Sequence, residues 1–170
     1  MADEQGPAID QAAGDNVPRA NILAQYVKDL SFENPNSPAV YQTSETPRID
    51  VQFNIGSNGA GEDVHEVLLK VDVIAKHEDR TAFQVELTYA GIFQLSNVPA
   101  DQMQPFLLVE APRILFPFAR RILADAVRDG NFPPLMLEPI DFAALYMQQR
   151  AQVAQGGSDN VDVDAPIGQA

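Results

Sequence analysis

Few side chains in this sequence could carry out chemistry. The chain has two histidines, His65 and His77, and no cysteine, so disulfides and thiolate chemistry are excluded. No nucleophile motif and no metal-ligand cluster at helical spacing accompanies either histidine. We therefore expect both histidines to be partly exposed residues of a strand or turn.

Carboxylates are plentiful, with 24 Asp and Glu against 11 Lys and Arg and a net charge of -13. They leave an acid–base pair open, but no phosphate-binding glycine loop followed by lysine is present. We expect no enzymatic activity, no metal and no cofactor. The acidic balance argues against nucleic acid, because phosphate binding needs clustered basic residues. A basic protein partner fits the charge better.

The charge is uneven along the chain. All basic residues lie between Arg19 and Arg150, whereas the two ends carry only acids. We expect one domain over 18–150, flanked by disordered acidic tails at 1–17 and 151–170. No apolar run is long enough to span a bilayer, and the acidic start lacks the features of a secretory signal. The expectation is a cytoplasmic protein that does not insert into the membrane.

The clearest elements are two strands in the stretch 64–95. One alternate set of residues is apolar in each half, while the complementary set carries Glu66, Lys70, Asp72 and Glu86. The apolar rows are Val67, Leu69, Val71, Val73 and Ala75, then Phe83, Val85, Leu87, Tyr89, Gly91, Phe93 and Leu95. They share one face only if the strands form an antiparallel hairpin.

Two further segments precede the hairpin. Residues 49–55 alternate in the same way and predict a third strand, which ends in a glycine-rich loop. Residues 20–33 fit either a helix or a strand with Ile22, Ala24, Tyr26, Leu30 and Phe32 on one face. Periodicity does not separate these two interpretations. The segment 34–47 is predicted to be an irregular crossover.

The second half of the chain is helical in pattern. An apolar stripe from Phe106 to Ala126 predicts a helix that Pro112 and Pro117 break or kink. Gly130 is expected to end it with a left-handed cap. After a proline-rich connector, Asp141 is the predicted N-cap of a last helix.

The segment Glu110-Ala111-Pro112-Arg113-Ile114-Leu115-Phe116-Pro117-Phe118-Ala119-Arg120 closely resembles the helix motif of SecB, the protein-export chaperone family of Gram-negative bacteria. Other motifs stand in that family's order: Lys28-Asp29-Leu30-Ser31-Phe32-Glu33-Asn34-Pro35-Asn36-Ser37-Pro38, Gly91-Ile92-Phe93, and Gly130-Asn131-Phe132-Pro133 through Leu145. The resemblance covers about residues 22–149. Departures are the lack of tryptophan and Gln84, where some members have an apolar residue.

The resemblance implies an α+β fold, with a four-stranded antiparallel sheet, a long kinked helix and a C-terminal helix, assembled as a dimer of dimers. It favours a strand over residues 20–33. It also implies a holdase chaperone without cofactor, which binds unfolded secretory precursor proteins in the cytoplasm, keeps them translocation-competent and delivers them to the SecA motor. The family's SecA contact carries over to Asp29, Glu33 and Glu86.

The residue pattern is compatible with that contact. In a strand, Asp29, Ser31 and Glu33 share one face opposite Leu30 and Phe32, so the acids can point to solvent together. The alternative is that any solvated sheet face collects carboxylates.

We expect a client-binding groove where the crossover and the connector meet the last helix. Broad apolar and aromatic surfaces there would accept extended chains without reading their sequence. The candidate residues are Tyr41, Phe132, Leu135, Leu137, Phe142 and Tyr146. The alternative, strongest for Phe142, is that these side chains are core.

Two other classes of function stay open at this point. One is a small-ligand-binding or isomerase-like α+β pocket protein, which would bind one small ligand stoichiometrically. The other is an adaptor that binds a folded partner and has no affinity for unfolded chains.

Overall fold

The computed structural model of the chain describes residues 16–155. Its strands are β1 (Arg19–Glu33), β2 (Arg48–Gly61), β3 (Val64–His77) and β4 (Arg80–Ser96). They form one antiparallel sheet in the order β1-β4-β3-β2. Helical segments are η2 (Ala39–Gln42), α1 (Ala100–Pro105), η3 (Phe106–Glu110), α2 (Ala111–Asp129) and α3 (Phe142–Gln155). The predicted α+β class, four-stranded sheet and two helices are confirmed.

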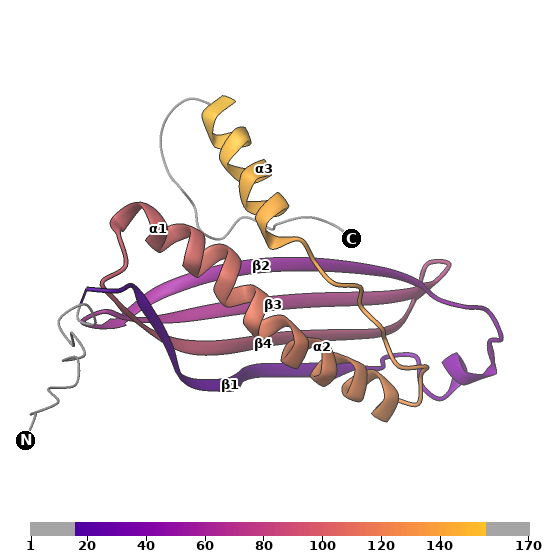
Figure 1. Cartoon of the computed structure of the whole chain (residues 1–170). Coiled ribbons are helices and arrows are strands. Elements are labelled where there is room, and N and C mark those ends of the chain that lie inside the picture. Colours follow the sequence, from indigo (N-terminus) through magenta and orange to yellow (C-terminus); the bar gives the residue numbers. More distant parts are fainter. Residues whose placement is uncertain (1–15, 156–170) are drawn as a thin grey trace, which may run out of the picture.

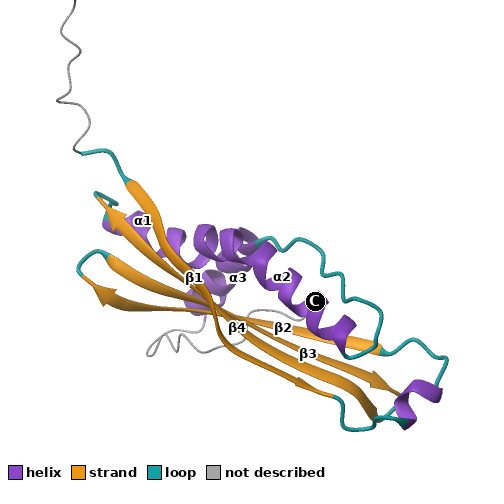
Figure 2. Cartoon of the chain, turned by 90° about the horizontal axis from the view of Figure 1, so that it is seen from below, coloured by secondary structure: helices purple, strands orange, loops and turns teal. Residues whose placement is uncertain are grey.

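The sheet has two unlike faces. The predicted apolar rows of β3 and β4 are buried under the helical layer, together with Val51, Phe53 and Ile55 of β2. We call this the helix face, and Figures 1 and 2 show the consecutive helices from α1 to α2 crossing it. The opposite side, which we call the open face, carries residues such as Gln52, Asp72 and Glu86. No helix covers it in either view.

The β3–β4 hairpin contains a bulge that its apolar pattern requires. His77 pairs with Arg80, so strict continuation of this register would place odd-numbered residues opposite even-numbered ones. The core rows of both strands are odd-numbered. The register shifts between Lys76↔Thr81 and Ala75↔Phe83, which leaves Ala82 as the extra residue. This insertion returns both apolar rows to the helix face.

The segment 20–33 is a strand, as the family resemblance implied. Its strict alternation was wrong, however, because the pairing with β4 shifts around Leu23 and again around Lys28. Tyr26 pairs with Ala90 on the open face, whereas Leu30 pairs with Leu87 on the helix face. Two bulges therefore separate residues that a simple period of two places together.

The helical layer is a continuous run from Ala100 to Asp129 with one widened turn, the π-helical η3. Of the expected break or kink at the prolines, a break at Pro117 is excluded, because Pro117 lies inside α2 and the helix continues through it. Pro112 lies in the first turn of α2, directly after η3. A proline there cannot donate to the preceding turn, and a local π geometry accommodates that missing bond.

The end of α2 differs from the expectation of a left-handed glycine cap. Gly130 has φ -75°, and the left-handed residue is Asn131 with φ 62°. Glycine is needed at 130 for space, since a Cβ there would lie 2.3 Å from Cζ of Phe32. At the middle of the sheet, a Cβ on Gly91 would lie 2.8 Å from Cδ2 of Leu115. The absence of a side chain at this position therefore lets α2 pack closely against β4.

The last helix begins as predicted. The carboxylate of Asp141 accepts a hydrogen bond from the backbone N–H of Ala144 at 2.9 Å. The expected boundary at residue 150 falls inside α3, which runs to Gln155. The remainder of the two expected tails, 1–15 and 156–170, lies outside the described residues. Within the described part, no helix is long and apolar enough to cross a membrane.

Candidate functional site

The three predicted acidic residues lie on the open face of the sheet. Ser31 of β1 pairs with Glu86 of β4, and the flanking pairs are Asp29↔Thr88 and Glu33↔Gln84. Opposed residues in an antiparallel pair point to the same side. Asp29, Glu33 and Glu86 therefore lie on one side of the sheet, as expected from the sequence, with Asp29 and Glu33 exposed and Glu86 half-buried.

A fourth carboxylate, Asp72, lies next to Glu86 on β3. Partial burial raises the pKa of Asp72; the nearby Lys70 ammonium, with Nζ 3.7 Å from Oδ2, opposes this rise, and Glu86 adds to it. The Glu86 carboxylate accepts a hydrogen bond from Nε2 of Gln84 at 2.9 Å. Adjacent carboxylates make this part of the open face a site that favours cationic groups.

Sequence reasoning noted Asp72 as a polar strand residue but did not place it beside Glu86. Its pairing with Glu86 follows from the register that the Ala82 bulge sets. The apolar residues are odd-numbered in both strands. With His77 paired to Arg80, an extra residue near the turn is needed to bring the two rows to the same face.

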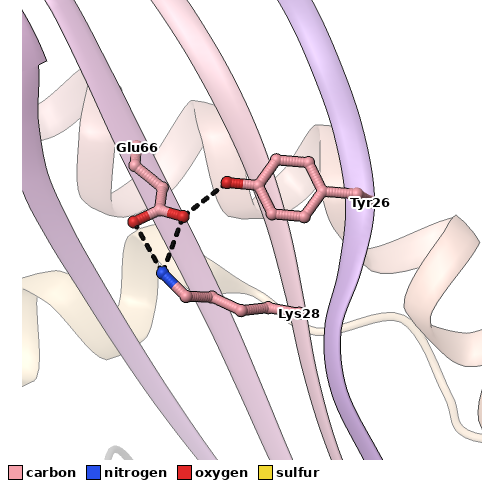
Figure 3. A network of polar contacts seen from close by, with 3 residues as sticks. All are labelled: Tyr26, Lys28 and Glu66. Atoms are coloured by element: carbon pink, nitrogen blue, oxygen red, sulfur yellow. Dashed lines mark hydrogen bonds and ion pairs between the residues drawn. The ribbon is translucent and has the colours of Figure 1, made fainter.

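The open face also carries a polar network that joins β1 to β3. Lys28 donates to both carboxylate oxygens of Glu66, at 2.8 and 2.9 Å, and the Tyr26 hydroxyl donates to Oε1. Figure 3 shows the three side chains converging from β1 and β3 across the intervening β4. The bonds from Lys28 and Tyr26 lower the pKa of Glu66, and the Glu66 contact raises the pKa of Tyr26. The network holds β1 to β3 independently of backbone pairing.

The predicted groove residues divide into three groups, of which the first joins the crossover to the end of α2. The ring centroids of Tyr41 and Phe132 lie 5.6 Å apart, and those of Phe132 and Phe83, a residue of the sheet, lie 4.8 Å apart. The Tyr41 hydroxyl donates to the carbonyl oxygen of Gly130 at 2.8 Å. Tyr41 nevertheless remains 42% exposed, so part of this residue is accessible to a ligand.

The second group belongs to the core of the single chain. Phe142 is 1% exposed and contacts Phe116 of α2 edge to face, with 5.9 Å between ring centroids. Leu135 is buried, and Leu137 packs against the same cluster from the connector. The connector thus presents these two leucines inward, with the exposed Met136 between them.

Tyr146 forms the third group and lines a separate groove between η3 and α3. The groove has a volume of about 500 Å³, and its walls include Phe106, Val109, Tyr146 and Met147. None of the other five predicted residues lines it. The predicted groove residues therefore do not form one cavity in the single chain. The sequence did not point to Phe106 and Val109, although η3 places both in this wall.

The histidines are placed as expected for structural residues. His65 pairs with Phe93 and Gly59 in the sheet, and His77 ends β3 beside the turn. Both are intermediate in exposure. Among residues 16–155, no three potential ligands gather closely enough to hold a metal ion.

Comparison with known proteins identifies the relatives of this chain. The family model described as "Preprotein translocase subunit SecB" matches residues 13–153. A protein-export protein SecB of Zymomonas mobilis is 65% identical over 156 residues, which cover 92% of this chain and 92% of that protein. The corresponding protein of Sphingopyxis alaskensis is 57% identical, covering 99% of this chain and 96% of its own length.

A solved structure shares the fold. It is a SecB-like chaperone of Mycobacterium tuberculosis in complex with a ChAD peptide from the HigA1 antitoxin. The TM-score is 0.61 at 15% sequence identity, and the match covers 72% of this chain and 91% of that one. At this identity, the similarity concerns the architecture alone.

Proposed function

The chain belongs to the SecB family, whose members are chaperones of the Sec export pathway, and on that premise we propose that it is a cytoplasmic holdase for unfolded secretory precursors. In this role the protein would keep precursors translocation-competent and deliver them to SecA. The observation that carries the proposal is the division of one small sheet into an open acidic face and a face whose helical layer leaves apolar and aromatic side chains exposed. Two kinds of partner can then bind at once.

Client binding is proposed at the aromatic surfaces of the helical side. Tyr41 is an exposed ring, Phe132 and Tyr146 are partly buried rings, and the connector adds the exposed Met136. An unfolded chain supplies apolar side chains at irregular spacing, so a surface of separate aromatic contacts suits it better than one shaped pocket. Phe142, Leu135 and Leu137 would support these contacts from below.

The SecA contact is proposed at Asp29, Glu33 and Glu86, with Asp72 as an added member. Their common position on the open face supports a basic docking partner. Charges at such a surface chiefly steer the encounter and are screened over about 8 Å at physiological salt.

Assembly into a homotetramer, a dimer of dimers, is also part of the proposal. Ile22, Val27 and Leu30 of β1 are each about 44% exposed, and so is Phe118 of α2. In the single chain β1 pairs on one edge only, with β4. Unpaired strand edges and contiguous apolar surface are typical of interfaces between subunits.

Size-exclusion chromatography with light scattering tests assembly and client capture together. We expect a mass near four times 18.6 kDa, and a larger complex after addition of a reduced, unfolded precursor. A monomer at micromolar concentration would refute the assembly. Failure to suppress aggregation of the precursor, combined with stoichiometric binding of a small ligand, would favour the pocket-protein alternative.

A further inference from the structure

The groove between η3 and α3 has an open apolar interior. Phe106 and Val109 come from the widened π turn, and Tyr146 and Met147 come from α3. Met147 is 65% exposed, although it is a large apolar side chain. A π turn of this kind displaces side chains from the regular helical stripe and is frequent at binding sites. The groove therefore has the volume and lining of a site for a short apolar segment.

Two charged residues border this groove, and they differ in their partners. Glu110 is engaged by Nη1 of Arg113, at 3.0 and 3.1 Å. Arg150 lies with its guanidinium 5.8 Å from the Tyr146 ring centroid, and no described carboxylate pairs with it. The unpaired charge at the border is thus positive, and an acidic ligand would complement it.

We propose that the groove binds the chain's own C-terminal segment 161–167. The sequence there is Val161-Asp162-Val163-Asp164-Ala165-Pro166-Ile167, in which apolar residues alternate with acids. When extended, such a segment directs Val161, Val163 and Ala165 to one side and both aspartates to the other. The apolar row fits the groove, and an aspartate at its border pairs with Arg150.

The length of chain between α3 and this segment permits the contact. Val163 is the eighth residue after Gln155, and a chain of this length reaches up to about 26 Å when extended. Met147 lies eight helical residues before Gln155, a rise of about 12 Å. The contact requires the chain to reverse direction after α3, and glycines at 156 and 157 allow such a reversal at low steric cost. Tethering through a linker of this length corresponds to an effective concentration of about 1 mM, so even a weak contact is populated.

The absence of native cysteine makes a disulfide test direct. In the full chain, Met147→Cys is combined with Val163→Cys. Closure, the formation of a disulfide between these two cysteines within one chain, is followed under mild oxidation. The matched control pairs Val163→Cys with Met136→Cys, at an exposed methionine of the connector that does not line the groove. We expect an intrachain disulfide that forms about tenfold faster than in the control, because local binding raises the encounter frequency.

Charge reversal separates specific docking from chance contact. Arg150→Glu should slow closure about threefold to fivefold, as loss of a border ion pair predicts. Arg121→Glu, an exposed reversal on α2, should leave the rate unchanged. Equal rates for the two cysteine pairs, or no effect of Arg150→Glu, would overturn the proposal. Crosslinks only between chains would assign the groove to a second copy's segment, and would equally overturn it.

A second measurement keeps the native side chains in the groove. Hydrogen exchange of the α3 amides in the full chain should quicken in Val163→Asp, a substitution outside the described fold. If exchange is unaltered by Val163→Asp and slows only when an unfolded protein is added, the groove binds clients alone and does not bind this segment. That result would reject the inference while leaving the proposed chaperone function intact.

Discussion

The hydroxyl group of Tyr41 donates a hydrogen bond to the carbonyl oxygen of Gly130 at 2.8 Å, and so joins the crossover to the end of α2. The Tyr41 hydroxyl oxygen in turn accepts a hydrogen bond from Nδ2 of Asn34 at 2.6 Å. Tyr41 is therefore both a tether between two loops and an exposed aromatic surface. Removal of the hydroxyl and removal of the ring should have different consequences.

Tyr41→Phe should loosen the crossover while retaining the ring contact with Phe132. The substitution removes both hydrogen bonds of the hydroxyl group, and each costs about 0.5–1 kcal/mol of unfolding free energy at this partly exposed site. Faster hydrogen exchange over residues 39–43, with client affinity maintained, is the expected result. The combined change Tyr41→Ala and Tyr146→Ala should instead weaken capture of an unfolded precursor without dissociating the assembly. If the assembly dissociates first, both tyrosines are structural.

Glu86→Lys should weaken binding of SecA and leave client binding largely intact. The substitution places a cation among Asp29, Glu33 and Asp72, where a basic partner is proposed to dock. Titration calorimetry at low and high salt measures both effects, and wild-type affinity should fall as salt rises. Glu62→Lys, an exposed reversal at the β2–β3 turn, is the matched control. Equal SecA affinity of wild type and Glu86→Lys would reject the assignment of this face.

Gly130→Ala should destabilise the fold through a steric contact. The backbone at this position suits alanine, but its Cβ would lie 2.3 Å from the ring of Phe32. Overpacking of this kind costs about 1–3 kcal/mol of unfolding free energy, measurable by denaturant titration. Gly59→Ala, with nothing within 4 Å of the added Cβ, should change stability little. Phe32→Leu should partly restore the Gly130→Ala variant, and no rescue would contradict the steric explanation.

The Tyr26–Lys28–Glu66 network should give the protein a pH-dependent contribution to stability at both extremes. The folded pKa of Glu66 lies below its usual 4.5, so its contribution is present above that pH and is lost as pH falls through the folded value. The folded pKa of Tyr26 lies above 10.0, so its contribution is present below pH 10.0 and is lost as pH rises through the folded value.

Unfolding free energies of wild type and Glu66→Gln, measured from pH 7 to pH 3, test the contribution of Glu66 to stability at low pH. The variant should be less stable at pH 7, and the difference should shrink as pH falls. A constant difference across this range would show that the Glu66 carboxylate charge does not stabilise the fold.

Some features of the protein were determined by local sequence alone. Alternation over residues 64–95 predicted the hairpin and its buried rows, because one residue type faces each side of a strand. Asp141 predicted the start of α3, because an N-cap acts within one turn. The motifs around Pro112 predicted the family, since their order extends over most of the chain.

Other features were decided only by tertiary structure. The bulges around Leu23 and Lys28 reverse which side chains share a face, and only the register against β4 reveals them. Gly130 is required by Phe32, a ring nearly a hundred residues away in sequence. The groove of Tyr146 depends on how the π turn meets α3. Periodicity and capping act over a few residues, whereas strand register and close packing are set by contacts between segments far apart in the chain.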